Sequence, residues 1–115
     1  MPDSPMVFDL AGLDRQTGGD RALRFEIVQM FLEDCPMRVG ELRAAIERGD
    51  AFAIRTIAHT LKGAAGYLSA ARVHAAARDL ETIGREARLA DAAAALERLA
   101  AAVAELIPEL RRIEP

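Results

Sequence analysis

A histidine, a lysine and two glycines lie close together within residues 54–68, whose sequence is IRTIAHTLKGAAGYL. On a helix with about 100° per residue, the apolar residues of this stretch form one stripe that faces a core, and His59 lies roughly 150° from its centre. The neighbours of His59 on the outer face are Arg55, Lys62, Gly63 and Gly66. We therefore expect an imidazole on a solvated helix face, beside an ammonium group and two positions without a side chain.

The two glycines and the lysine are unusual choices for stability alone. A glycine inside a helix costs about 0.5–1 kcal/mol relative to alanine, and this chain has 24 alanines. The glycines therefore suggest that another molecule approaches the backbone closely. Lys62 is the single lysine beside 14 arginines, and its head is a compact charge on a flexible stem. An exposed neutral imidazole beside a mobile cation suits a nucleophile that takes up a phosphoryl group from a docked partner.

The segment His59-Thr60-Leu61-Lys62-Gly63 resembles the H-x-L-K-G signature of histidine-containing phosphotransfer (HPt) domains. These domains are four-helix bundles that relay phosphoryl groups in multistep two-component signalling. The resemblance covers nearly the whole chain. The family's N-terminal lead-in is similar to Phe8–Leu10 followed by Gly19–Asp20, its first long helix to Phe31–Pro36, and the turn before its histidine helix to Gly49–Asp50. The resemblance implies that His59 accepts the phosphoryl group on Nε2 and that Lys62 and Gly63 support the site.

The resemblance also implies the partners. His59 would take the phosphoryl group from the aspartyl-phosphate of a receiver domain, in a response regulator or a hybrid kinase, and pass it to an aspartate of another receiver. Mg²⁺ and the acceptor carboxylate would belong to the receiver, so we expect no cofactor on this chain. Docking would use the outer face around His59, with Arg55 and Gly66. The adjoining part of the first long helix would extend this surface through Asp34, Met37 and Arg38.

Two positions depart from the family pattern. Members often carry glycine where this chain has Ser69, and a small polar residue where it has Ala64. Neither change touches His59, so both bear on the geometry of the helix end rather than on the chemistry.

Capping residues and apolar spacing predict an all-α fold. Residues 1–7 should be a flexible lead, and Phe8–Leu13 a short helix capped by Asp9. Asp20 is the expected N-cap of the first long helix, in which Pro36 should cause a kink or a split.

Gly49 and Asp50 should end that helix and cap the histidine helix, which we place at Ala51–Leu68. Two more helices are expected, one at Ala71–Ala87 and one that begins near Asp91 and frays or kinks at Pro108. Short connections make neighbouring helices antiparallel, so residues 1–115 should form a single domain. Its core would be an up-down-up-down four-helix bundle from about residue 20 to 112.

Composition excludes several classes of function. The net charge of −3 is spread along the chain, which argues against nucleic-acid binding. No apolar run approaches the length of about 18 residues that a membrane helix needs. The single Cys35 fits a reducing cytoplasm. The chain contains no Walker loop, Rossmann glycine pattern or G-x-S-x-G motif, so we expect no autokinase activity. A monomer is favoured because the bundle closes its own core.

Each candidate residue also has a structural interpretation. His59 could be an ordinary surface histidine, Lys62 a solvated charge, and the two glycines close-packing sites between helices. We expect His74 to be a partly exposed structural residue, and no spacing of metal ligands is present. The acidic residues Glu33, Asp34 and Glu81 are expected to be solvated helix charges rather than an acid/base pair.

Two rival functions remain. The chain could be a non-catalytic helical adaptor that binds a receiver without phosphotransfer, in which case binding would not depend on His59. It could also be a substrate domain like that of a chemotaxis kinase, phosphorylated directly by an ATP-binding domain. This hypothesis is disfavoured because residues 1–115 include no kinase, although a kinase could act in trans. The chain begins with Met1 and has its own lead-in, so we expect a free-standing protein.

Overall fold

The computed structural model describes residues 6–115, which form helices joined by short turns and loops. This region contains no strand, and the all-α prediction is confirmed. Residues 1–5 of the expected lead lie outside the described residues. Met6 accepts a backbone hydrogen bond of 3.2 Å from Arg72, and Val7 packs against the core. The elements are α1 (Leu10–Gln16), α2 (Arg21–Glu47), α3 (Ala51–Leu68), α4 (Ala71–Arg85), the 3₁₀ turn η1 (Leu89–Asp91) and α5 (Ala92–Arg111).

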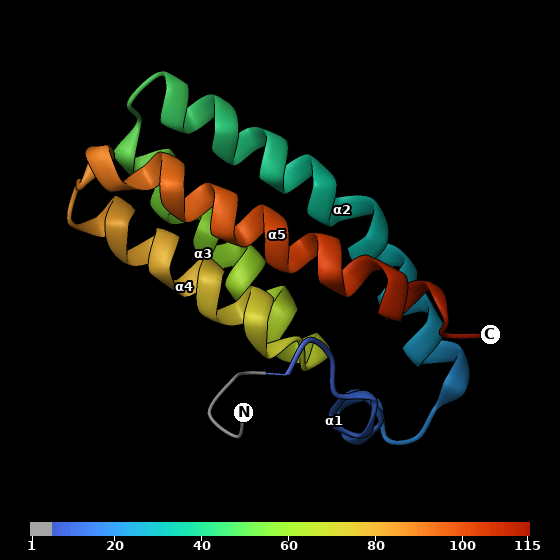
Figure 1. Ribbon diagram of the computed structural model, residues 1–115. Coiled ribbons are helices and arrows are strands. Elements are labelled where there is room, and N and C mark those ends of the chain that lie inside the picture. The colour runs from blue at the N-terminus through green and yellow to red at the C-terminus, as the bar shows by residue number, and fades with distance from the viewer. Residues whose placement is uncertain (1–5) are drawn as a thin grey trace.

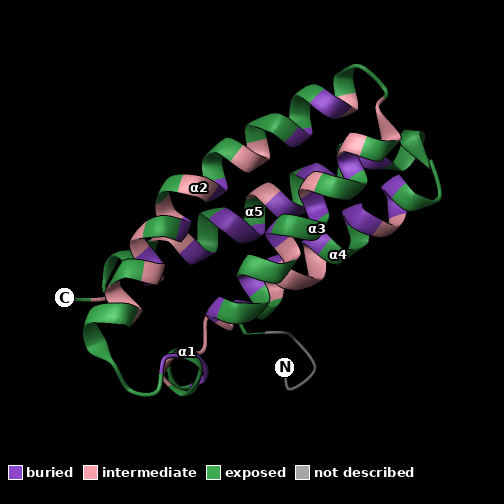
Figure 2. Cartoon of the chain, turned by 180° about the vertical axis from the view of Figure 1, so that it is seen from behind, coloured by how far each residue is buried: buried purple, intermediate pink, exposed green. Residues whose placement is uncertain are grey.

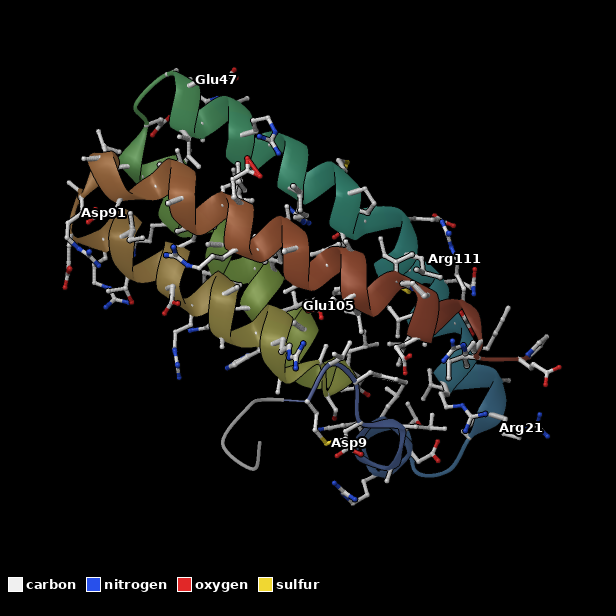
Figure 3. All side chains as sticks on the ribbon, in the orientation of Figure 1. Asp9, Arg21, Glu47, Asp91, Glu105 and Arg111 are labelled. Carbon is white, nitrogen blue, oxygen red and sulfur yellow. The ribbon has the colours of Figure 1, made fainter. Side chains whose placement is uncertain are left out.

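The four long helices α2 to α5 lie side by side, and the short α1 lies at one end of them (Figure 1). Helix α3 packs against α2 and α4, and α5 packs against α4 and α2. Glu47 and Asp91 mark one end of the molecule, whereas Asp9 and Arg21 mark the other (Figure 3). At this second end the guanidinium of Arg21 donates a hydrogen bond of 3.3 Å to the carbonyl of Pro115. The contacts between helices give each long helix two neighbours, and the four helices together enclose a common core.

Capping side chains fix the starts of α2 and α3 as the sequence predicted. The carboxylate of Asp20 accepts a hydrogen bond of 3.0 Å from the backbone of Leu23, and that of Asp50 accepts one of 3.0 Å from Ala53. Each satisfies a backbone N–H that has no partner inside its helix. Gly49 turns the chain between the two helices with a φ of +67°. The predicted bounds of α3 are confirmed.

The bounds of α1 and α4 differ from the predictions, and α1 runs over Leu10–Gln16 rather than Phe8–Leu13. Helix α2 is continuous through Pro36, so the predicted alternative of a split into two pieces is wrong, and α5 continues through Pro108 to Arg111. Packing along the helix compensates for the backbone hydrogen bond that proline removes. Helix α4 ends at Arg85 rather than Ala87, since Ala87 has a φ of +53°. Asp9 stands at the start of α1, but its side chain makes no capping hydrogen bond.

The core consists of the inward faces of the long helices, where buried residues follow one another along each helix (Figure 2). The apolar stripe predicted on α3 is buried, with Ile57 partly so; the fully buried members are Ile54, Ala58, Leu61, Ala65 and Leu68.

Helices α3 and α4 approach each other closely at Gly84. A Cβ atom added there would lie 2.6 Å from the backbone nitrogen of Arg55 and 2.9 Å from the carbonyl oxygen of Ala51. Real side chains do not tolerate such distances, so this approach requires glycine. Because α3 and α4 pack so closely here, side chains of α4 lie next to side chains on the outer face of α3.

Candidate functional site

His59 stands on the outer face of α3, where its side chain is 67% exposed. Its ring nitrogen Nδ1 lies 2.6 Å from the carboxylate oxygen Oε2 of Glu81 on α4. Because a carboxylate can only accept, Nδ1 carries the proton and donates it. Among the described residues, Nε2 has no hydrogen-bond partner. In this tautomer Nε2 carries the lone pair, so the ring presents a nucleophilic nitrogen to solvent.

Glu81 is buried, with only 7% of the residue exposed, and the prediction that it is a solvated helix charge is wrong. Its neighbours one turn away along α4 are the small residues Ala77 and Gly84, which let α4 come close enough to α3 for the carboxylate to lie beneath His59. Its second oxygen, Oε1, accepts a hydrogen bond of 2.6 Å from Lys62 Nζ. The hydrogen bond from Lys62 lowers the pKa of the Glu81 carboxyl, burial opposes this, and the bond from His59 lowers it further.

Lys62 is held by this ion pair, with 26% of its side chain exposed. It therefore differs from the mobile cation that the sequence suggested. One buried carboxylate bridges the imidazole and the ammonium group, and its two oxygens each have one partner. Such charge-assisted hydrogen bonds are short and hold their groups in fixed positions.

The two glycines of α3 differ in their surroundings. A Cβ on Gly63 would meet no described atom within 4 Å, apart from its own helix backbone and chain neighbours, so packing within residues 6–115 does not require glycine there. A Cβ on Gly66 would lie 3.2 Å from Nδ1 of His74. That nitrogen donates a hydrogen bond of 3.1 Å to the carbonyl of Lys62. Gly66 thus makes room for the partly buried His74, whereas Gly63 leaves open surface beside His59.

Three arginines surround the site. Arg55 precedes His59 by one turn on α3, while Arg78 and Arg85 lie one turn before and one turn after Glu81 on α4. All three are exposed, and within residues 6–115 their side chains form no hydrogen bond or ion pair. We call them the basic rim. The rim makes the surroundings of His59 positive in a chain whose net charge is −3.

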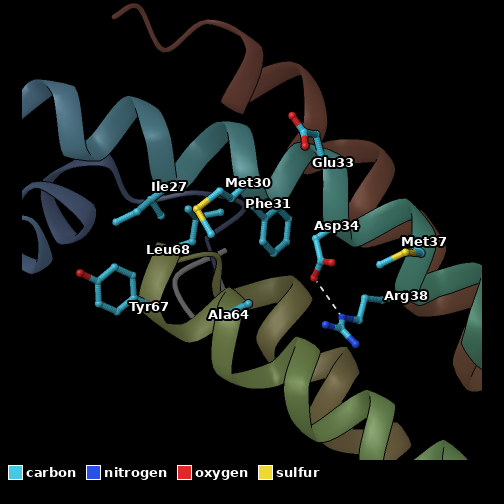
Figure 4. Close-up of a pocket in the computed structure, with 10 residues that line it drawn as sticks. All are labelled: Ile27, Met30, Phe31, Glu33, Asp34, Met37, Arg38, Ala64, Tyr67 and Leu68. Carbon is cyan, nitrogen blue, oxygen red and sulfur yellow. Dashed lines mark hydrogen bonds and ion pairs between the residues drawn. The ribbon is translucent and has the colours of Figure 1, made fainter.

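A groove of about 710 Å³ runs between α2 and α3. Figure 4 shows Tyr67 and Ala64 of α3 on one side of it and Met30 and Met37 of α2 on the other, with the Asp34–Arg38 pair at one end. Met30, Met37 and Tyr67 are exposed. The docking residues expected on α2, which are Asp34, Met37 and Arg38, thus line an apolar groove. Tyr67 also lines this groove, which the sequence did not predict. The full lining of the groove is Ile27, Met30, Phe31, Glu33, Asp34, Met37, Arg38, Ala64, Tyr67 and Leu68.

The described part of the chain has neither a cluster of metal ligands nor a membrane-spanning helix. Residues 6–115 contain no group of three or more His, Cys, Asp and Glu side chains placed to hold a metal ion. Within the same residues, no helix has the length and apolar character needed to cross a membrane.

Comparison with known proteins shows the family to which the chain belongs. The chain matches the Hpt domain over residues 26–110, and it therefore belongs to the Hpt domain family of two-component phosphorelay proteins. A solved relative is the histidine-containing phosphotransfer protein B (HptB) from Pseudomonas aeruginosa PAO1. Its crystal structure superposes with a TM-score of 0.88 at 25% sequence identity, and 95% of each chain is covered. No curated protein sequence matches the chain.

Proposed function

We propose that the chain is a histidine phosphocarrier in a multistep phosphorelay. His59 accepts the phosphoryl group from a receiver-domain aspartyl-phosphate and passes it to an aspartate of another receiver. One observation carries the proposal: the exposed ring of His59 is held at Nδ1, 2.6 Å from the buried Glu81 carboxylate. Membership of the Hpt family supports the same assignment.

The contact between His59 Nδ1 and Glu81 accounts for which ring nitrogen attacks phosphorus. The Nε2 lone pair forms a bond to phosphorus while the bond between phosphorus and the aspartyl oxygen breaks, and the aspartate leaves as a carboxylate. The ring then carries a proton on Nδ1 and a phosphoryl group on Nε2, so it is positively charged. The Glu81 carboxylate stabilises that charge, and its position is set before the reaction. Lys62, whose Nζ lies 2.6 Å from the other oxygen of this carboxylate, would help to balance the phosphoryl charge, and Mg²⁺ would be supplied by the receiver.

Docking would combine three surfaces around His59. The open backbone at Gly63 lets a partner approach the ring, since no side chain of this chain covers it. The basic rim favours an acidic partner surface. The groove between α2 and α3 offers exposed apolar side chains, including Met37 and Tyr67, for a helix of the receiver. These features support Arg55, Lys62 and Gly63 as docking or supporting residues, whereas Gly66 also serves the contact with His74.

The domain organisation, oligomeric state and localisation are inferred from the family and from the short links between the helices. We infer that residues 1–115 act as a single Hpt-like unit and that α2 to α5 follow an up-down-up-down order, which the short links between them favour. We further propose that the chain works as a cytoplasmic monomer, without binding nucleic acid or membrane. It would lack autokinase activity and depend on receiver domains for its phosphoryl group.

The test is incubation with a ³²P-labelled phosphoreceiver and Mg²⁺, without ATP or a kinase. Wild type and the His74→Gln control should gain label, whereas His59→Gln should not. His74 is the chain's other histidine, so it controls for nonspecific labelling. Label on His59→Gln would refute the assignment. Receiver binding without label on any protein, unchanged in His59→Gln, would instead establish the adaptor.

A further inference from the structure

We propose that Glu81 and Lys62 act as positioning residues with opposite effects on the outgoing step, together setting the pH range in which phosphorylated His59 releases its phosphoryl group. The inference rests on the proposed function, because it concerns the phosphorylated form of His59. It goes further, because it assigns a controlling role to a buried carboxylate that does not touch the reacting atoms.

The first step is the chemistry of the leaving group. When the nitrogen–phosphorus bond breaks, its electron pair stays on Nε2 and phosphorus forms a bond to the oxygen of an aspartate or of water. If Nδ1 keeps its proton, the ring leaves as neutral imidazole. If Nδ1 has lost its proton, the ring must leave as an imidazolate anion, which is a much poorer leaving group. The form protonated at Nδ1 is therefore the phosphoryl donor.

The second step is the contact that holds this proton. Glu81 Oε2 lies 2.6 Å from Nδ1, and the carboxylate is shielded from solvent by α3 and α4. A nearby negative charge in such a setting favours the protonated ring. Glu81 thus keeps phosphorylated His59 competent to donate up to a higher pH than an exposed phosphohistidine would be.

The third step is the opposing charge of Lys62. Its Nζ lies 2.6 Å from Glu81 Oε1, so it counteracts the field of the carboxylate at the ring. The other charged groups beside the site are Arg55 on α3 and Arg78 and Arg85 on α4, and all three are cationic. His74 lies on α4, one turn before Arg78, and its Nδ1 donates to the carbonyl of Lys62. On the α2 side, three charged residues line the groove: Asp34 pairs with Arg38 at 2.9 Å, and Glu33 forms no ion pair with a described residue. Neither carboxylate forms a hydrogen bond with the His59 ring, whose described partner is Glu81. Glu81 is therefore the negative charge that holds the ring proton.

The test uses phosphoramidate, a small phosphoryl donor, so that no receiver is needed. Phosphorylated His59 is followed by ³¹P NMR as it hydrolyses, from mildly acidic to mildly alkaline pH. Compared with wild type, Glu81→Gln should move the midpoint of the pH–rate profile about one pH unit lower, and Lys62→Met should move it higher. Glu97→Gln serves as the control, because this exposed glutamate on α5 pairs with Arg43, away from the site.

The outcomes separate the two proposals. If wild-type His59 takes no phosphoryl group from phosphoramidate or from a phosphoreceiver, the proposed function fails and this inference fails with it. If His59 is phosphorylated but both variants follow the wild-type profile, or both move in the same direction, the function stands and the inference is overturned. Lys62→Met leaves Glu81 in place, so the sign of its shift decides the matter even if Glu81→Gln folds poorly.

Discussion

Replacement of Gly84 by alanine should separate α3 from α4 and disturb the site without changing any residue in it. The added Cβ would lie 2.6 Å from the backbone nitrogen of Arg55, about 1 Å closer than an ordinary contact. Backbone atoms cannot rotate away, so the two helices must move apart. Glu81 lies one turn from Gly84, and a displacement of this size would stretch its hydrogen bond to His59 beyond the normal range.

The change in the free energy of unfolding caused by Gly84→Ala is the sum of two opposing contributions. Overpacking of a core contact costs about 1–3 kcal/mol, and the exchange of glycine for alanine in a helix returns about 0.5–1 kcal/mol. The difference between these ranges is about 0–2.5 kcal/mol, so Gly84→Ala should lower the free energy of unfolding by roughly 1 kcal/mol. Urea denaturation followed by circular dichroism measures this change. An unchanged dependence of the free energy on urea concentration would show that wild type and Gly84→Ala expose similar surface areas on unfolding.

Gly63→Ala is the matched control. It is the same substitution in the neighbouring helix, at a position where the Cβ has open space. It should raise the free energy of unfolding by about 0.5–1 kcal/mol. If Gly84→Ala proved as stable as Gly63→Ala, the close approach of α3 and α4 at Gly84 would be refuted.

Three further predictions concern Glu81, the groove and the cysteine. The pKa of the Glu81 carboxyl is lowered from 4.5 in the folded state, so its stabilising effect is complete above this value and is lost as the pH falls through the folded pKa. Urea titrations on acidification should therefore show a larger loss of stability for wild type than for Glu81→Gln. In the groove, Met37→Asp or Tyr67→Ala should weaken receiver binding about tenfold by calorimetry, whereas Leu89→Ala, an exposed apolar residue outside the groove, should leave it unchanged. Burial raises the pKa of the Cys35 thiol to about 11, so a thiol reagent should modify native protein far more slowly than protein in urea, and equal rates would contradict its burial.

Local features of the sequence were sufficient to predict α3 and its exposed histidine. The apolar stripe repeats at helical spacing, and Asp50 caps the helix with its own side chain, so both signals lie within a few residues of each other. The wheel position of His59 follows directly from that spacing. For the same reason the N-cap at Asp20 was predictable.

The contact between His59 and Glu81 was not predictable in this way. It joins residues that are 22 positions apart, and it depends on how α4 is rotated against α3. A signal did exist: Glu81 lies beside the buried Leu80 and Ile83, with Ala77 and Gly84 one turn away on either side. A carboxylate between small residues at the edge of an apolar stripe indicates a close helix contact.

Gly66 and Pro36 show two other limits of sequence reasoning. A glycine that lets a partner approach and a glycine that makes room for His74 look the same in the sequence, and only the packing of α4 distinguishes them. Pro36 removes a backbone hydrogen bond, yet α2 continues, because tertiary packing along the helix outweighs that local loss.

The most direct test of the central claim is ¹H–¹⁵N NMR of the histidine side chains after the protein has reacted with a phosphoreceiver. The account predicts a single phosphorylated ring, that of His59, with phosphorus on Nε2 and the proton kept on Nδ1 beside Glu81. A phosphoryl group on Nδ1, on His74, or on neither histidine would contradict it.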